Sequence, residues 1–296
     1  MLDIIIERLR QKNRTVAYPS GAPSLMPRFR GRPFIDADLC AGTRGEDCPA
    51  CTAACSLGAI SLEEGTPILD MGKCTFCGDC ARACGRGALV FTTDWRLAST
   101  ERSALLIRPQ KYAEVAASPE TKGAAGQSLP QDGARAFLLP ELPILACTDG
   151  GGRFARSFRL RQVTAAGCGA CEADLNVLST VVFDIPRFGM DFVASPRHAD
   201  GLVLTGPVPR NMREALLKCH KAMAAPKPVI AVGACAISGG LFRPDEEDAL
   251  SQRAKGADEH VPVSLYIPGC PPHPYTSLDG MLRFIGRKVF SPVEKF

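Results

Sequence analysis

The chain has 296 residues, of which 46% are hydrophobic and 22% charged, and its formal net charge is +4. This length predicts about two domains, each with a core of ordinary size. The mild charge, the lack of a Lys/Arg block and the 6% aromatic content argue against a nucleic-acid partner and against platforms for stacking bases.

Residues 1–34 are expected to form a polar N-terminal arm. The apolar run Ile4–Ile6 is too short for a signal-peptide core, and no stretch approaches the roughly 20 apolar residues that span a bilayer. We therefore expect a cytoplasmic protein, which could still sit on a membrane complex through a partner. This arm, which contains the basic stretch at residues 27–33, is interpreted as extended and lying on its own or a neighbouring domain, with docking to a partner as the alternative.

Residues 35–93 are dense in cysteine and contain an internal repeat. Five residues recur 29 positions further along, where Cys48, Cys51, Cys55, Gly58 and Ala59 return as Cys77, Cys80, Cys84, Gly87 and Ala88. A duplicated half-domain is far more specific than a single Cys-x2-Cys pair. Because the chain is long and has no export signal, its fourteen cysteines favour metal binding over a disulfide framework.

The second half of the repeat has the spacing of one half of a bacterial ferredoxin, Cys74-x2-Cys77-x2-Cys80-x3-Cys84. Three closely spaced thiols on a tight loop bind one 4Fe–4S cluster, while the fourth points toward the other cluster. The pattern assigns Cys40, Cys48, Cys51 and Cys84 to a first cluster, and Cys74, Cys77, Cys80 and Cys55 to a second. We therefore predict an α+β ferredoxin-like domain over residues 35–93.

Cys40 departs from the strict repeat, which would place the first cysteine at Gly45. An insertion of five residues explains the offset, and a longer loop can still return a thiolate to the cluster at little entropic cost. Without Cys40 the first site could hold a three-iron cluster. Zinc is the alternative for this region, but zinc prefers two separated Cys pairs that close one tetrahedron.

Residues 94–155 are predicted to be a linker and an irregularly packed segment, because residues 118–133 lack periodicity and prolines interrupt residues 137–146. Residues 156–296 then change to an α/β pattern. Strands are predicted at residues 158–163, 191–194, 201–205, 229–232 and 263–267, and helices at residues 172–182, 211–224 and 274–289. This alternation predicts a doubly wound, flavodoxin-like parallel sheet.

Four cysteines of this region stand just beyond predicted strands: Cys168, Cys171, Cys235 and Cys270. The carboxyl ends of parallel strands line one crevice, so these thiols are expected to converge, and the flanking glycines let backbone approach a cluster. A redox dithiol at Cys168 and Cys171 is the alternative. Cys219, on the apolar face of a helix, and Cys147, in a loop, are interpreted as structural.

Five segments carry a family resemblance: GCGACE at residues 167–172, SPRHAD at 195–200, LTGPV at 204–208, GACAISGG at 233–240 and IPGCPP at 267–272. Residues 156–290 resemble the electron-transfer small subunit of group 4 membrane-bound nickel–iron hydrogenases, which includes that of formate hydrogenlyase, and the related complex I B subunit. The N-terminal third resembles the ferredoxin-like subunit of those complexes, so the chain resembles a fusion of the two.

The resemblance implies that Cys168, Cys171, Cys235 and Cys270 bind a third 4Fe–4S cluster beside a large subunit. It also implies three clusters that relay electrons from a redox donor protein to a catalytic centre outside this chain, with membrane subunits reached through the complex. Glu172 could influence protons or the third cluster, or be an ordinary helix N-terminal residue. A quinone-reducing complex I-like assembly, with a D-subunit-like partner, and a stand-alone carrier or redox sensor are the alternatives.

Overall fold

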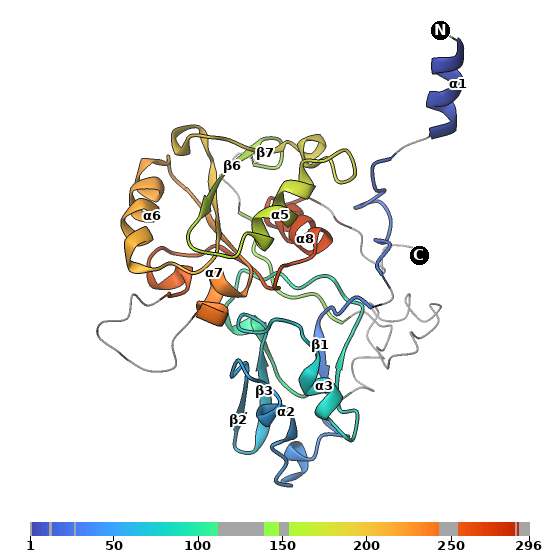
Figure 1. Ribbon diagram of the computed structural model, residues 1–296, viewed down its shortest axis with the longest axis vertical. Helices are drawn as coiled ribbons and strands as arrows, with labels where there is room; N and C mark the ends of the chain where they lie inside the picture. Colours follow the sequence, from blue (N-terminus) through green and yellow to red (C-terminus); the bar gives the residue numbers. More distant parts are fainter. Residues whose placement is uncertain are drawn as a thin grey trace.

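The computed structural model describes residues 2–11, 14–26, 28–111, 139–147, 154–242, 254–287 and 289. Two modules are stacked along the long axis of the molecule, with the cysteine-rich N-terminal module at one end and the α/β module above it (Figure 1). Among the described helices, none has the length and apolar character needed to cross a bilayer.

The C-terminal module is built on five parallel strands, in the order β7-β6-β8-β9-β10. Their bounds are β6 Phe158–Thr164, β7 Met190–Phe192, β8 Gly201–Thr205, β9 Val229–Val232 and β10 Leu265–Ile267. Counted along the chain this is the 2-1-3-4-5 order of flavodoxin-like folds. The predicted parallel α/β sheet is therefore confirmed, and all residues of β8 and β9 are buried, as expected for a sheet covered on both faces.

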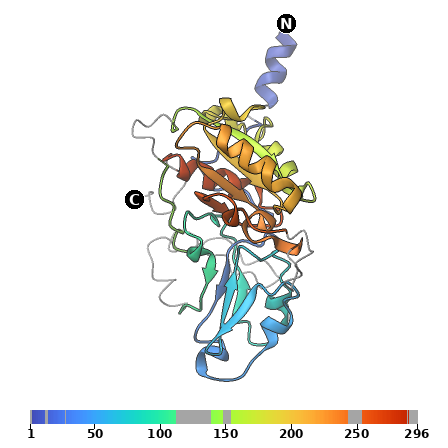
Figure 2. The same cartoon turned by 90° about the vertical axis from the view of Figure 1, so that its left-hand side faces the viewer.

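Helices cover both faces of this sheet. Figures 1 and 2 place α6 (Arg210–Ala222) on one face, and α5 (Ala170–Leu178) with α8 (Pro274–Phe284) on the other. The short α7 (Ala234–Ser238) follows β9 directly. Short 3-10 turns complete the module at Ile185–Phe188, Pro196–His198, Gly240–Phe242 and Ala257–Glu259.

Two helices of this module end earlier than predicted. The helix predicted to run to residue 182 ends at Leu178, and the β-branched residues Thr180, Val181 and Val182 lie beyond it. The helix predicted to run to residue 289 ends at Phe284, where Gly286 adopts a left-handed conformation with φ of 76°. A left-handed glycine just beyond the last turn is a common helix stop.

The N-terminal module consists of two small antiparallel sheets and two short helices. One sheet pairs β1 (Pro33–Ile35) with β4 (Leu89–Phe91), and the other has the order β2-β3-β5. The remaining elements are β2 Ile60–Glu63, β3 Thr66–Asp70, β5 Leu106–Ile107, the helices α2 Ala50–Ala53 and α3 Asp79–Ala83, and 3-10 turns at Gly42–Arg44 and Ser103–Leu105. This arrangement agrees with the predicted α+β ferredoxin-like domain.

The sequence duplication is also a structural duplication. Ile60 pairs with Leu69 on one side of the module, and Leu89 pairs with Ile35 on the other. Ile60 and Leu89 are related by the 29-residue repeat, whereas Ile35 and Leu69 differ by 34 positions. The five extra residues therefore lie between the first strand of the module and its helix α2.

Two expectations about segment boundaries need correction. The arm is not extended throughout, because Leu2–Gln11 form helix α1 and β1 begins at Pro33. The segment after residue 93 is not simply a linker, since β5 adds to the sheet of β2 and β3 through the pairs Leu69–Ile107 and Asp70–Leu106. The proposed linker at residues 118–133 lies outside the described residues.

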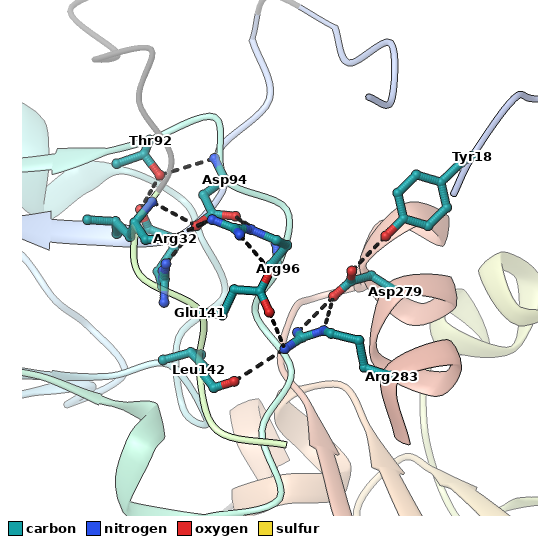
Figure 3. A network of polar contacts seen from close by, with 10 residues as sticks. Tyr18, Arg32, Thr92, Asp94, Arg96, Glu141, Leu142, Asp279 and Arg283 are labelled. Atoms are coloured by element: carbon teal, nitrogen blue, oxygen red, sulfur yellow. Dashed lines mark hydrogen bonds and ion pairs between the residues drawn. The ribbon is translucent and has the colours of Figure 1, made fainter. Parts of the chain in front are cut away.

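A network of buried charges joins the arm, both modules and the segment at residues 139–142 (Figure 3). Arg32 and Arg96 both bind Asp94, and Arg96 also binds Glu141 at 2.9 Å. At the other end of the network, Asp279 accepts hydrogen bonds from Tyr18 at 2.6 Å and from Arg283 at 2.8 Å. Because the acids and bases alternate, each buried charge has partners of the opposite sign.

The two modules also share apolar contacts. One buried cluster contains Met71 and Leu105 of the N-terminal side together with Ile237 and Tyr266 of the C-terminal module. Two backbone hydrogen bonds join Ser99 and Tyr266, at 3.0 and 2.8 Å. The modules are thus packed against each other through a common core, which fixes their cysteine loops in space.

Candidate cluster-binding sites

The four cysteines predicted for the first cluster surround one cavity of about 210 Å³, lined by Cys40, Cys48, Cys51 and Cys84. Cys51 is contributed by α2, and Cys84 comes from the second half of the repeat, directly after α3. The pKa of the Cys51 thiol is raised by burial and by the neighbouring Cys40 and Cys84. The structure therefore brings the expected set together, including the thiol from the other half.

Cys40 occupies the same local position as Cys74. The Cys40 N–H donates to the carbonyl of Asp36 at 3.0 Å, and the Cys74 N–H donates to the carbonyl of Asp70 at 3.1 Å. The Asp36 carboxylate accepts from the N–H of residue 38 at 3.0 Å, as the Asp70 carboxylate accepts from that of residue 72 at 2.8 Å. Cys40 is thus the counterpart of Cys74, and the insertion lies in the loop after it.

The second predicted set also lines a single, tighter cavity of about 20 Å³, formed in part by Cys55, Cys74, Cys77 and Cys80. Phe76 with φ of 57° and Gly78 with φ of 82° turn the loop sharply between these cysteines. Backbone N–H groups face two of the sulfurs, from Phe76 to Cys74 Sγ at 3.2 Å and from Ala59 to Cys55 Sγ at 3.3 Å. Such N–H groups can also donate hydrogen bonds to the sulfurs of a bound cluster.

Burial controls the protonation of these thiols. Burial and, to a smaller extent, the neighbouring thiols raise the pKa of Cys74 to about 12 and that of Cys80 to about 11. Without a cation these thiols stay protonated at neutral pH, so a metal must displace their protons. A set of mutually repelling thiolates is stable only around a centre of positive charge, which fits an iron–sulfur cluster.

The third set lies at the carboxyl edge of the C-terminal sheet. Cys168 follows β6, Cys171 lies in the first turn of α5, Cys235 lies in α7 after β9, and Cys270 follows β10. Burial first, then Glu172 and the other three thiols, raise the pKa of Cys171 to about 12. Burial, Cys270 and Cys168 raise the pKa of Cys235 to about 11. The four thiols therefore lie within electrostatic reach of one another.

Glycines make this convergence possible. A Cβ built on Gly233 would lie 2.6 Å from the Cys171 sulfur, and a Cβ on Gly240 would lie 2.8 Å from the Cys235 sulfur. Both glycines also have positive φ angles, of 90° and 54°. Any larger residue would be strained in its backbone and would displace a sulfur that the third site needs.

The remaining candidates have other environments. Cys219 lies on α6, where burial raises its pKa while Arg161 lowers it, and Cys147 donates its N–H to the carbonyl of Phe284 at 2.7 Å. Glu172 Oε1 accepts a hydrogen bond from Thr205 Oγ1 at 2.5 Å, at the edge of the sheet next to Cys171. This contact anchors the start of α5 to β8.

Two features of the sites were missed by sequence reasoning. Gly72 lies against Ile237 of α7, and Arg30 of the arm donates to the carbonyl of Phe76 at 2.9 Å, inside the second cysteine loop. The FRGRP segment at residues 29–33 was the available signal for Arg30, but nothing in the sequence indicated its target. Across the described residues, no three His, Cys, Asp or Glu side chains converge closely enough for a single metal ion.

Comparisons with known proteins agree with this geometry. Residues 168–284 match the family described as NADH ubiquinone oxidoreductase, 20 Kd subunit, and residues 67–90 match the 4Fe-4S binding domain. The first range contains all four cysteines of the third set, and the second contains three cysteines of the second set together with Cys84.

Curated relatives come from two kinds of complex. Formate hydrogenlyase subunit 7 of Escherichia coli (strain K12) is 40% identical over 134 residues, covering 45% of this chain and 51% of that protein. NAD(P)H-quinone oxidoreductase subunit K of Prochlorococcus marinus (strain MIT 9211) is 39% identical over 132 residues, covering 44% and 51%. The chain thus spans about half the length of these relatives.

A solved structure, that of the membrane-bound sulfane sulfur reductase, an archaeal respiratory membrane complex, contains a chain that is 29% identical. The match covers 45% of this chain and 71% of that one, with a TM-score of 0.38. The α/β module, with its strand order and its third cysteine set, is therefore similar over residues 168–284 to the family described as NADH ubiquinone oxidoreductase, 20 Kd subunit, and residues 67–90 are similar to a 4Fe-4S binding domain.

Proposed function

We propose that this chain is the iron–sulfur electron-transfer subunit of a hydrogenase of the formate hydrogenlyase type, with three 4Fe–4S clusters. The first is held by Cys40, Cys48, Cys51 and Cys84, the second by Cys55, Cys74, Cys77 and Cys80, and the third by Cys168, Cys171, Cys235 and Cys270. The observation that carries the proposal is the grouping of twelve cysteines into three sets of four, two of which line cavities.

The chain's own residues hold and order these sites. When bound, a 4Fe–4S cluster accepts and releases one electron without a proton acceptor on the protein. Cys55 and Cys84 each cross to the other half of the repeat, so the first two sites share one rigid scaffold. Met71 and Ile237 belong to one buried hydrophobic core, which holds the second cysteine loop against the cysteines of the third set. This arrangement supports a linear path from the first site to the third.

The proposed partners follow from the position of the third set. Cys168 is exposed at the carboxyl edge of the sheet, where a large subunit carrying a nickel–iron centre would exchange electrons with the third cluster. A redox donor or acceptor protein would dock at the ferredoxin-like module. The membrane subunits of such a complex would hold the chain at the cytoplasmic face of the inner membrane.

A quinone-reducing assembly is the second candidate, because the subunit K relative is nearly as similar as the hydrogenlyase relative. The spacing of Cys168 and Cys171 by two residues favours the hydrogenase type. Identification of the large subunit that co-purifies separates the two, because only a nickel–iron subunit carries two Cys-x2-Cys nickel motifs. Purification as a lone monomer would instead favour a stand-alone carrier or redox sensor.

Metal analysis of the anaerobically purified chain tests the cluster assignment. Three 4Fe–4S clusters require about twelve iron atoms and about twelve sulfides per chain. Stoichiometric zinc without sulfide would refute the proposal. The matched control is Cys219→Ser, which should keep the full iron and sulfide content because Cys219 lies on α6, in none of the three sets.

A further inference from the structure

The duplicated cysteine loops allow each position of the second site to be compared with its counterpart in the first. Phe76 and Arg82 of the second loop correspond to Asp47 and Ala53, 29 positions earlier. Lys73, which precedes Cys74, corresponds to Leu39, which precedes Cys40. The two loops share a backbone design but differ in charge at these three positions, and at a fourth the second loop has Asp79 where the first has Ala50.

Arg30 adds a further positive charge to the second loop. Its Nη1 donates to the carbonyl of Phe76 at 2.9 Å, and a Cβ built on Gly78 would lie 3.1 Å from its Nε. Phe76 and Gly78 flank Cys77, so the guanidinium lies over the exposed edge of the second site. Within the described part of the chain, Arg30 forms no ion pair with a carboxylate that would neutralise it.

A second arginine approaches the same loop from α3. Arg82 Nη1 donates to the carbonyl of Cys77 at 3.3 Å, and its guanidinium also pairs with Asp79. At the first site the bases Arg44 and Arg86 are instead paired with Glu46, at 3.4 and 2.6 Å. With Asp47 beside Cys48 counted, Arg44 and Arg86 are matched by two acids around the first set. Around the second set, Lys73 beside Cys74 brings the bases to three, with Arg30 and Arg82, against the single acid Asp79.

This asymmetry has a redox consequence. Reduction adds one negative charge to a cluster, and nearby positive charge stabilises the reduced form, which raises the reduction potential. We propose that Arg30 is a positioning residue that fixes the second cysteine loop and raises the potential of the second cluster above that of the first. Electrons that enter at the first set then pass favourably to the second, which adjoins the C-terminal module.

The inference rests on the proposed function, because it requires clusters at both sites. It also gives the N-terminal arm a role. Arg30, in the segment before β1, brings a positive charge to the second site. Neither half of the duplication supplies an arginine at that position. The two halves of a symmetric scaffold thereby become unequal, which is what a directional relay needs.

The test is an EPR-monitored redox titration of the full chain with its clusters, in which the second cluster's signal is identified as the one altered in Cys77→Ser. We expect Arg30→Gln to lower the midpoint potential of the second cluster and to leave that of the first unchanged. Arg30→Lys, which keeps the charge, should stay near the wild-type value. Arg210→Gln, an equal charge change at the start of α6, is the control and should shift neither.

An unchanged second midpoint in Arg30→Gln, with iron and sulfide at the wild-type level, overturns the inference. If that variant fails to assemble its second cluster, Arg82→Gln provides the same comparison from the other side of the loop: a lowered midpoint supports the inference, and an unchanged one overturns it. A wild-type chain without iron and sulfide would instead refute the proposed function, so the two failures are distinct.

Discussion

Gly72 and Ile237 meet where the two modules join, because a Cβ built on Gly72 would lie 2.8 Å from Cγ2 of Ile237. Gly72 stands two residues before Cys74, and Ile237 stands two residues after Cys235. The backbone of the second cysteine loop therefore touches the helix that carries a thiol of the third set. The Arg102 guanidinium also lies against Gly72, with its Cζ 2.9 Å from the built Cβ, so the loop is enclosed from both sides at this point.

The contact predicts that Gly72→Ala destabilises the protein by about 1–3 kcal/mol, because the new methyl group overpacks a closed interface. Anaerobic denaturant unfolding measures the effect. Combining the change with Ile237→Ala should recover part of the loss, since the clashing methyl is removed. Gly21→Ala is the control, because its Cβ would meet only Ala17 Cβ at an ordinary 3.9 Å. Equal effects of the two glycine substitutions would contradict the packing argument.

Cys40→Ser is expected to reduce the iron content as strongly as Cys74→Ser. The two cysteines have matching backbone hydrogen bonds to Asp36 and Asp70, so each should present its thiol to its own cluster in the same way. Iron and sulfide analysis with EPR checks this, and a three-iron signal in Cys40→Ser is the specific expectation. Full iron content in Cys40→Ser alone would exclude it as a ligand. Cys147→Ser is the control and should retain every cluster.

The thiol sets could be predicted from sequence because their signals are local or periodic. The 29-residue repeat located the first two sets, and the glycine-flanked cysteines after apolar strands located the third. The equivalence of Cys40 and Cys74 was predicted only by assuming a five-residue insertion, whose position the broken repeat does not give. Only the hydrogen bonds of Asp36 and Asp70 place the five extra residues after Cys40.

Contacts between segments that are far apart in the chain leave no comparable pattern in the sequence. Strand β5 is two residues long and owes its place to pairing with β3 rather than to its own sequence. Helix α1 was not predicted, although its apolar residues have helical spacing, and in the structure Ile4, Ile5 and Leu9 are exposed. The charge network of Figure 3 joins residues up to 261 positions apart, a distance over which a single sequence carries no pairing signal.

That network predicts that Asp94→Asn is strongly destabilising, by about 3–5 kcal/mol, because Arg32 and Arg96 would be left buried without their carboxylate. Denaturant unfolding at neutral pH provides the measurement. Glu63→Gln, which breaks the exposed pair with Arg108, is the control and should change stability by about 1 kcal/mol or less. A similar small effect at both positions would mean that the network does not hold the modules together.

The stability of wild type and that of Asp94→Asn should depend differently on pH. Burial acts to raise the pKa of Asp94, but Arg32 and Arg96 outweigh burial and hold it below its ordinary value. A carboxyl group whose pKa is lower in the folded state stabilises the fold at pH values above its unfolded-state pKa of about 4. This contribution is lost as the pH falls through the folded-state pKa. The stability advantage of wild type over Asp94→Asn should therefore shrink in acid. An advantage that is constant with pH would contradict the ion-pair account.

Gly233→Ala should abolish the third cluster while sparing the other two. The added Cβ would lie 2.6 Å from the Cys171 sulfur, and a φ of 90° is strained for any residue with a side chain. Both effects move the backbone between β9 and Cys235, so the four thiols no longer converge. Iron should fall from about twelve atoms per chain to about eight, with the EPR signals of the first two clusters retained.

Gly85→Ala is the matched control for this glycine, because Gly85 also adjoins a cysteine but has nothing within 4 Å of its Cβ position. It should keep all of its iron. If Gly233→Ala also kept about twelve iron atoms, the cysteines after β6, β9 and β10 could not be sharing one cluster at the geometry described, since the substituted residue occupies the space of a ligand. If both variants lost iron from every site, the effect would lie in folding rather than in the third site.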